Sequence, residues 1–379
     1  MRKFAATILS LVVALGILAG CGGAKDSAPS TDAKKDAAAA AQQPAAKKDL
    51  KPAFVYVGPV GDAGWTWAHD QGRQHMEKQL GLKATFVESV PEGADSERIF
   101  EELVQKGHNP IFGTSFGYMD AMLAVAKRHP EVKFFHATGI QTAENLSTYF
   151  GREYQARYLT GIVAGLQTKK NVIGYVAAMP IAEVIRGINA FTMGARSVNP
   201  AVKVKVVWTN TWYDPAREKD AAKSLLDAGA DLITMHQDTP GPLQAAEERG
   251  AWAVGYNSDM SKFAPKAFLT APVWNWGPYY VKAVKSVQEG TFKADAYWGP
   301  MKDGIIDLAP ISDKAHADAK KKVEEVKSKI LAGTWDVFTG PVKDQSGKER
   351  LAKDAKMSDK DMLSMDYFVE GVEGSIPKK

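Results

Sequence analysis

The chain is organised around the stretch GPVGDAGWTWAHDQG, residues 58–72. It follows an apolar run at residues 53–57 that predicts a buried strand, and it leads into a mixed polar and apolar segment that predicts a helix. Its glycines let the backbone turn sharply or approach a ligand closely. Asp62, Trp65 and Trp67 lie among them. Because ligands of open α/β sheets bind at the carboxyl ends of strands, this stretch is a candidate binding loop.

A second stretch repeats this chemistry much later in the chain. Residues 272–277 read PVWNWG and contain Trp274, Asn275 and Trp276. In an extended Trp-x-Trp segment both rings project to the same side, where they can form a stacking wall. The two loops together predict one cleft that holds a flat, hydrogen-bonding solute.

Apolar, β-branched runs alternate with amphipathic stretches along most of the chain. Strands are predicted at residues 53–57, 84–87, 110–113, 133–136 and 147–150, and again at 172–176, 202–208, 231–235, 251–255 and 267–270. Helices are predicted at residues 96–106, 118–128, 155–166, 184–197, 215–228 and 242–249. Such alternation indicates parallel sheets built of βαβ units. The phrase of helix end, glycine and strand at 102–113 returns at 224–235, which predicts two similar α/β lobes.

The predicted domain boundaries follow from this repetition. The first lobe comprises residues 52–167 and about 271–296, and the second comprises residues 168–270 and about 297–342. Within the second lobe, residues 313–332 predict a lysine-rich helix and residues 334–339 a late strand. The polar tail, residues 343–379, is expected to wrap the surface.

The amino terminus has the pattern of a secretory signal over residues 1–21. A short basic start is followed by an apolar run and by Leu-Ala-Gly-Cys, which ends at Cys21, the only cysteine of the chain. This ending resembles the bacterial lipobox, so we expect lipidation at Cys21 and anchoring to a bacterial membrane in the cell envelope; an ordinary cleaved signal is the alternative. Residues 22–51 are polar and lack apolar periodicity, which predicts a flexible tether.

Composition and motif spacing exclude several classes of function. The formal charge is +4 and falls to about +2 once Arg2 and Lys3 leave with the signal, and no basic block with interleaved aromatics suggests nucleic acid. There is no P-loop, and the seven scattered histidines and single cysteine do not form a metal motif, so we expect neither a cofactor nor a metal. Ser115, in GTSFG, superficially resembles a nucleophile elbow, but no histidine stands out as its partner. We therefore expect no catalytic residue and no enzymatic activity.

Polar and aromatic side chains near the predicted strand ends make up the remaining candidates. Each aspartate among them is by default a helix cap, but a carboxylate is also a natural acceptor for the N–H groups of a planar heterocycle. The complete predicted ligand-binding set is Asp62, Trp65, Trp67, Phe116, Tyr118, Asp120, Trp212, His236, Asp238, Asn257, Asp259, Trp274, Asn275 and Trp276.

Several phrases, in this order and spacing and together with the lipobox, carry a family resemblance. They are Val-Asn-Pro at 198–200, Trp-Tyr-Asp-Pro at 212–215, Ala-Gly-Ala-Asp at 228–231 and Val-Gly-Tyr-Asn-Ser-Asp at 254–259. Over residues 52–376 the chain resembles the BMP lipoprotein family, the basic-membrane-protein or PnrA-like solute-binding proteins of ABC transporters. The resemblance implies a periplasmic-binding-protein type I fold, with two Rossmann-like lobes hinged around a cleft. It also implies capture of purine nucleosides or related purines for an ABC permease. We expect the protein to be a monomer.

The resemblance further assigns roles to individual positions. It implies that Trp65 stacks on the base, that Asp62 and Asp120 accept hydrogen bonds from it, and that Asp259 contacts the ribose. The family's lysine after the strand at 267–270 is replaced here by Pro-Val-Trp-Asn-Trp, which favours a free base over a nucleoside. A ligand-sensing receptor module of the same fold and an exported nucleoside hydrolase are the alternative functions.

Overall fold

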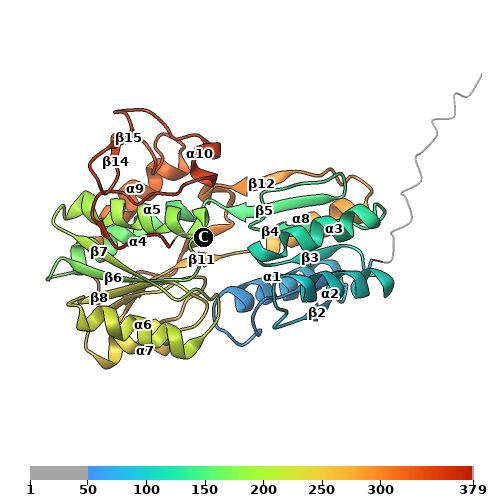
Figure 1. Ribbon diagram of the computed structural model, residues 1–379, viewed down its shortest axis with the longest axis horizontal. Coiled ribbons are helices and arrows are strands. Elements are labelled where there is room, and N and C mark those ends of the chain that lie inside the picture. The colour runs from blue at the N-terminus through green and yellow to red at the C-terminus, as the bar shows by residue number, and fades with distance from the viewer. Residues whose placement is uncertain (1–49, 378–379) are drawn as a thin grey trace, which may run out of the picture. The chain divides into compact units, whose positions relative to one another are not determined.

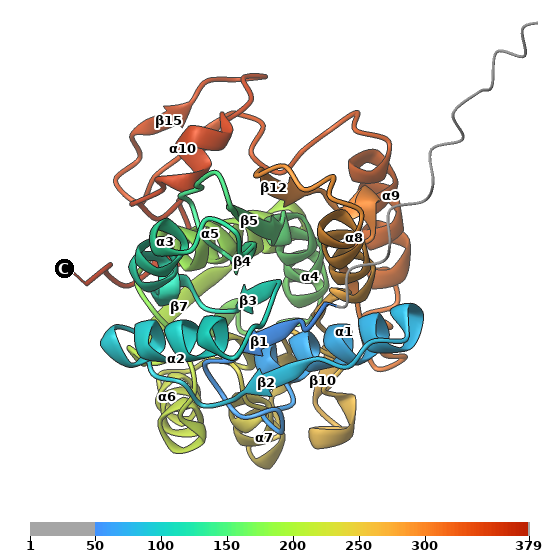
Figure 2. The ribbon, with the colours of Figure 1, turned by 90° about the vertical axis from the view of Figure 1, so that its right-hand side faces the viewer.

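A computed structural model describes residues 50–377 of the chain, which form two α/β lobes (Figure 1). The sheet of the first lobe has the order β12-β5-β4-β3-β1-β2 and is parallel throughout. Its strands are β1 (Ala53–Val55), β2 (Thr85–Val87), β3 (Ile111–Gly113), β4 (Phe134–Ala137), β5 (Leu146–Gly151) and β12 (Ala296–Gly299). Its helices are α1 (Trp65–Leu80), α2 (Ala94–Gln105), α3 (Met119–Arg128) and α8 (Gly277–Gln288). Helices α1 and α8 pack together on one side of the sheet, and α2 and α3 on the other (Figure 2).

The sheet of the second lobe has the order β10-β9-β8-β6-β7-β16 and is also parallel. Its strands are β6 (Val172–Ala177), β7 (Lys203–Trp208), β8 (Leu232–His236), β9 (Trp252–Val254), β10 (Phe268–Thr270) and β16 (Val372–Glu373). Its helices are α4 (Glu153–Gln167), α5 (Ala182–Val198), α6 (Pro215–Asp227), α7 (Gly241–Glu248) and α9 (Ala319–Leu331).

The chain crosses between the lobes after β5, after β10 and after β12. At the second and third crossings, β11 (Pro272–Trp274) pairs antiparallel with β13 (Ile306–Leu308). The predicted fold, two parallel-sheet lobes joined by crossing strands, is confirmed. The predicted strands of both sets agree with β1–β10 to within two residues at their ends.

Local sequence explains several of these elements. Strands β3 and β4 are buried along their whole length, as expected for parallel strands covered on both faces. Helix α1 ends at Gly81, whose φ of +65° is a left-handed conformation that glycine adopts without strain. Helix α6 begins where the Asp214 side chain accepts a hydrogen bond from the Arg217 amide, with Pro215 in the first turn.

Three regions differ from the sequence-based assignment. The sequence assigned the segment of helix α4 to the first lobe, but α4 packs along α5 of the second lobe. Glycine allows the two helix backbones to touch, since a Cβ at Gly161 would lie 2.1 Å from the Phe191 carbonyl oxygen. Strand β12 continues to Gly299 in the first sheet. Residues 334–339 form no strand; instead Val337 and Phe338 are buried in an irregular segment.

The carboxyl-terminal tail contributes to the second lobe as well as lying over it. It forms a hairpin of β14 (Val342–Lys343) and β15 (Glu349–Leu351), then the short helix α10 (Asp359–Leu363), and ends in β16, which extends the second sheet beside β7. Met362, Met365 and Phe368 are buried. Because these apolar residues are spread among many charges, sequence periodicity does not reveal them.

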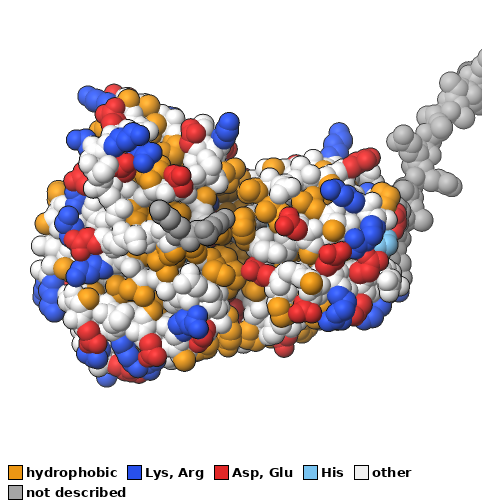
Figure 3. Space-filling view, in the orientation of Figure 1, with side chains coloured by type: hydrophobic (Ala, Val, Ile, Leu, Met, Phe, Trp, Pro, Cys, Tyr) orange, Lys and Arg blue, Asp and Glu red, His pale blue; other side chains and the backbone are white. Residues whose placement is uncertain are grey.

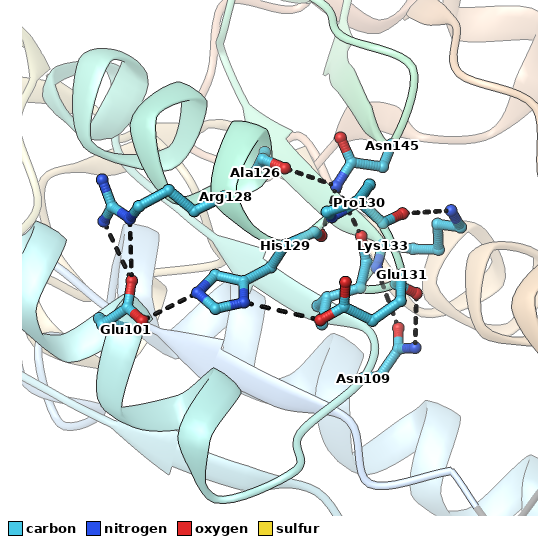
Figure 4. Close-up of polar contacts among 10 residues, drawn as sticks. Glu101, Asn109, Ala126, Arg128, His129, Pro130, Glu131, Lys133 and Asn145 are labelled. Atoms are coloured by element: carbon cyan, nitrogen blue, oxygen red, sulfur yellow. Dashed lines mark hydrogen bonds and ion pairs between the residues drawn. The ribbon is translucent and has the colours of Figure 1, made fainter.

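A polar cluster at the far end of the first lobe ties α2, α3 and the following loop together (Figure 4). Glu101 accepts hydrogen bonds from Arg128 and His129, and Asn145 Nδ2 donates to the carbonyl oxygens of Ala126, His129 and Val132. These contacts satisfy the carbonyl groups at the end of α3. This cluster is structural and lies away from the cavity described next.

Candidate functional site

A cavity lies between the lobes, at the carboxyl ends of strands from both sheets. Hydrophobic side chains gather on the surface where the lobes meet (Figure 3). The cavity is lined by Val57, Trp65, Ser115, Phe116 and Thr138 from the first lobe, and by Glu183, Trp212, His236, Asp238 and Tyr256 from the second. Its free space is about 20 Å³, room for about one water molecule, so the lobes are closed on each other. A wider cavity of about 270 Å³ adjoins it and shares Phe116, Thr138 and Glu183.

The indole of Trp65 forms part of the first-lobe wall of the cavity. Its Nε1 donates to the Thr114 carbonyl oxygen at 2.7 Å, which fixes the ring in place. Behind it, Trp274 and Trp276 stack on each other with centroids 4.5 Å apart, and His69 continues the stack at 4.5 Å from Trp276. Trp65 meets both tryptophans edge to face. The sequence predicted that Trp274 and Trp276 line the cavity. They do not line it, but support Trp65, which does.

Asp238 is the most deeply buried carboxyl group of the cavity. Its Oδ1 accepts a hydrogen bond from Asn257 Nδ2 at 3.3 Å, while its Oδ2 has no partner among the described residues. Burial raises the pKa of Asp238 well above its usual value, and the nearby carboxylates of Asp62 and Glu218 raise it further.

His236 and Glu183 form the second polar group of the cavity. His236 Nε2 lies 3.5 Å from Glu183 Oε1, and His236 Nδ1 has no partner within residues 50–377. Burial, then the positive charges of Arg157 and Arg186, lower the pKa of His236 well below its usual value. Burial raises the pKa of Glu183 to about 7, although the same two arginines act in the opposite direction. The cavity thus presents the polar groups of Asp238, His236 and Glu183 beside aromatic rings.

Asp62 is a helix cap in this structure. Its carboxylate accepts hydrogen bonds from the backbone N–H groups of Gly64, Thr66 and Trp67 at 2.8–2.9 Å, which satisfies free donors at the start of α1. Burial raises its pKa to about 6 against the lowering effect of these bonds. The role of Asp62 at the cavity is indirect, because it fixes the beginning of the helix that carries Trp65.

The other predicted residues lie at varying distances from the cavity. Of the fourteen, Trp65, Phe116, Trp212, His236 and Asp238 line it, and Asn257 stands directly behind Asp238. Tyr118 is buried in the core, where its hydroxyl donates to the Val90 carbonyl oxygen, because it begins α3 on the side facing α2. The exposed members are Trp67, Asp120, Asp259 and Asn275. The structure thus does not bring Asp120 and Asp259 to the cavity.

Five lining residues were not predicted: Val57, Ser115, Thr138, Glu183 and Tyr256. All of them except Glu183 follow strands, so the expectation that ligands bind at the carboxyl ends of strands could have found them. Glu183 opens α5 after a longer loop, and its sequence neighbours carry no such signal. Ser115 Oγ donates to Glu92, and His136 Nε2 contacts the main-chain oxygen of Ser115 at 2.6 Å, so the histidine beside this serine is not placed to act as its base.

Contacts across the gap hold the lobes together. Glu92 Oε1 of the first lobe accepts from the Gly117 amide at 3.0 Å and from Trp212 Nε1 of the second lobe at 3.2 Å. Gly64 fits directly against the Asp238 backbone, since a Cβ there would lie 2.2 Å from the Asp238 carbonyl oxygen. Trp212 thus both lines the cavity and bonds across the gap.

Comparison with known proteins agrees with this geometry. Residues 50–338 match the family described as ABC transporter substrate-binding protein, PnrA-like. The chain belongs to this family. It is 46% identical over 335 residues to a purine-binding protein of Brucella abortus, covering 88% of this chain and 95% of that one. It is 42% identical over 335 residues to a candidate ABC transporter glucose-binding protein of Haloferax volcanii, covering 88% of this chain and 83% of that one.

A solved structure with a similar fold is an ABC transporter solute-binding protein of Aeropyrum pernix. Its TM-score is 0.67 at 20% identity, with 79% of this chain and 94% of that chain covered. The chain is thus a substrate-binding protein of an ABC transporter, and its family works outside the cytoplasm. Within residues 50–377 no helix is both long and apolar enough to span a membrane. Cys21, the predicted lipidation site, and the tether up to residue 49 lie outside the described residues.

Proposed function

We propose that this PnrA-like protein captures a purine between its lobes and prefers the free base to the nucleoside. The observation that carries the proposal is the lining of the cavity. Trp65 and Phe116 from one lobe oppose Trp212 and Tyr256 from the other, around the buried polar groups of Asp238, His236 and Glu183. A purine is planar and apolar on its faces and carries donors and acceptors on its edge, so it complements aromatic walls and an edge of polar groups. The name of the Brucella relative supports the same ligand class.

The preference for a base rests on the rigid first-lobe wall of the cavity. Each ribose hydroxyl left without a partner would cost about 1–3 kcal/mol. Trp65 is held rigidly in this wall, because its Nε1 bonds to the Thr114 carbonyl oxygen and its ring rests on the Trp274–Trp276 stack. The two later tryptophans thus restrict the ligand by supporting the wall rather than by occupying the place of a sugar.

Two other ligands have specific support. A nucleoside could extend its ribose into the adjoining cavity, where Thr138, Thr148 and Arg186 offer polar groups beside aromatic rings. A sugar is suggested by the name of the Haloferax relative. Whichever ligand binds, we propose a monomer that is lipid-anchored at Cys21, closes on its ligand and docks on a permease.

Calorimetric titration of the protein lacking residues 1–21 tests the proposal. Adenine is compared with adenosine, hypoxanthine with inosine, and glucose is titrated separately. We expect both bases to bind more tightly than their nucleosides. Tighter binding of both nucleosides would reject the preference for a base and indicate that the ribose lies in the adjoining cavity. Binding of glucose alone would overturn the purine assignment. Release of base from a nucleoside over many turnovers would instead reveal a hydrolase.

A further inference from the structure

Trp274 donates a hydrogen bond that determines how Asn257 is oriented. Its Nε1 lies 3.0 Å from Asn257 Oδ1, and its backbone amide also bonds to the Asn257 carbonyl oxygen at 3.2 Å. Trp274 belongs to β11, on the segment that crosses between the lobes, whereas Asn257 follows β9 of the second lobe. The φ of Asn257 is +69°, a left-handed conformation that asparagine adopts more readily than most residues.

The orientation of Asn257 determines in turn what Asp238 can do. With Oδ1 occupied by the indole, Asn257 Nδ2 points to the Gln237 carbonyl oxygen and to Asp238 Oδ1, both at 3.3 Å. A flipped amide would set its nitrogen against the indole N–H and its oxygen against two acceptors. The unflipped amide bonds to Asp238 Oδ1, while Oδ2 of this cavity-lining residue is buried and has no partner among residues 50–377.

We infer that Trp274 is a positioning residue for ligand binding, which acts through Asn257 to hold the Asp238 carboxyl group in one orientation at the cavity. This inference rests on the proposed function, since it assumes that Asp238 bonds to the ligand. Because the relay joins the crossing strand to the second lobe, the carboxyl group is held in register with the Trp65 wall, which rests on the same indole.

The chain offers a matched control in Trp276. Its ring stacks on that of Trp274 at 4.5 Å and is also buried, but its Nε1 has no partner among the described residues. Trp274→Phe and Trp276→Phe therefore remove the same ring portion and the same kind of N–H from one stack. Only the first removes the bond to Asn257.

The test measures adenine affinity of the wild type and these two variants by calorimetry, with thermal unfolding to confirm that each is folded. We expect Trp274→Phe to weaken binding about tenfold and Trp276→Phe to have a clearly smaller effect. In an Asp238→Asn background, Trp274→Phe should cost little more, because the relay acts on that carboxyl group. Equal losses in the two tryptophan variants, or additive losses with Asp238→Asn, would overturn the inference.

A measurement without ligand separates this inference from the proposed function. In the wild type, the Asn257 side-chain amide signals in nitrogen-15 spectra are assigned by their loss in Asn257→Asp. They should shift in Trp274→Phe and remain nearly unchanged in Trp276→Phe. If the wild type binds no purine, the proposed function fails, and an amide signal unmoved in Trp274→Phe would also reject the relay itself.

Discussion

Replacing Trp212 with phenylalanine keeps an aromatic ring at the cavity and removes the indole N–H that reaches Glu92 across the gap. Glu92 retains its bonds from Ser115 Oγ and the Gly117 amide, so its carboxylate is not left without partners. The lost bond involves a charged acceptor, but both side chains are partly exposed, so we expect a cost of about 1 kcal/mol, or about fivefold in affinity.

The loss should appear in the dissociation rate. The bond joins two lobes that must separate to release the ligand, so it stabilises the closed, ligand-bound form and contributes little to the first encounter. Stopped-flow tryptophan fluorescence with adenine measures both rates. Glu92→Gln, which leaves the ring intact and weakens the acceptor, should change the dissociation rate in the same direction.

Trp208→Phe is the matched control. Trp208 Nε1 also donates to an oxygen, the Ser375 carbonyl at 2.9 Å, and its ring stacks on Phe368 at the edge of the second sheet. It does not line the cavity. An unchanged dissociation rate in Trp212→Phe, or an equal acceleration in Trp208→Phe, would refute the role of Trp212 in holding the lobes closed.

Three further predictions concern the anchor, the stacking wall and pH. Cys21→Ser should release the folded protein from membranes in a fractionation experiment; unchanged membrane association would contradict lipidation. Trp65→Ala should weaken adenine binding, measured by calorimetry, about tenfold or more, since stacking on a base contributes about 1–3 kcal/mol. The control is Trp335→Ala, which should have little effect on this affinity because Trp335 lies beside Tyr158 and does not line the cavity. Burial raises the pKa of Glu183 to about 7, so its contribution to stability is full below about pH 4 and declines as the pH rises to 7. In urea unfolding, Glu183→Gln should therefore lose less stability over this pH range than the wild type. Parallel stability profiles of the two proteins would count against the raised pKa.

The alternation of apolar strands and amphipathic helices was by itself enough to determine a fold of two parallel-sheet lobes. Within each element the apolar residues recur with the period of its buried face, near two residues in a strand and near 3.6 in a helix. The glycine-rich turn after β1 marks the end of that strand. The same local logic placed Trp65, Phe116, His236 and Asp238 after strands, where parallel sheets present side chains to a cleft.

Which of these strand-end residues meet depends on how the two lobes pack, and the sequence pattern did not predict it. In sequence, Asp62 and Asp259 resemble Asp238, because all three follow predicted strands. In the structure, the Asp62 carboxylate accepts hydrogen bonds from the amides at the start of α1, and the exposed Asp259 carboxylate accepts one from the Ser261 amide. Trp274 was expected in the cavity, but β11 crosses between the lobes at that point and turns its indole toward Asn257. A local pattern reports the environment of its own backbone, whereas a site depends on how segments far apart in the chain pack against one another, and sequence spacing carries no record of that packing.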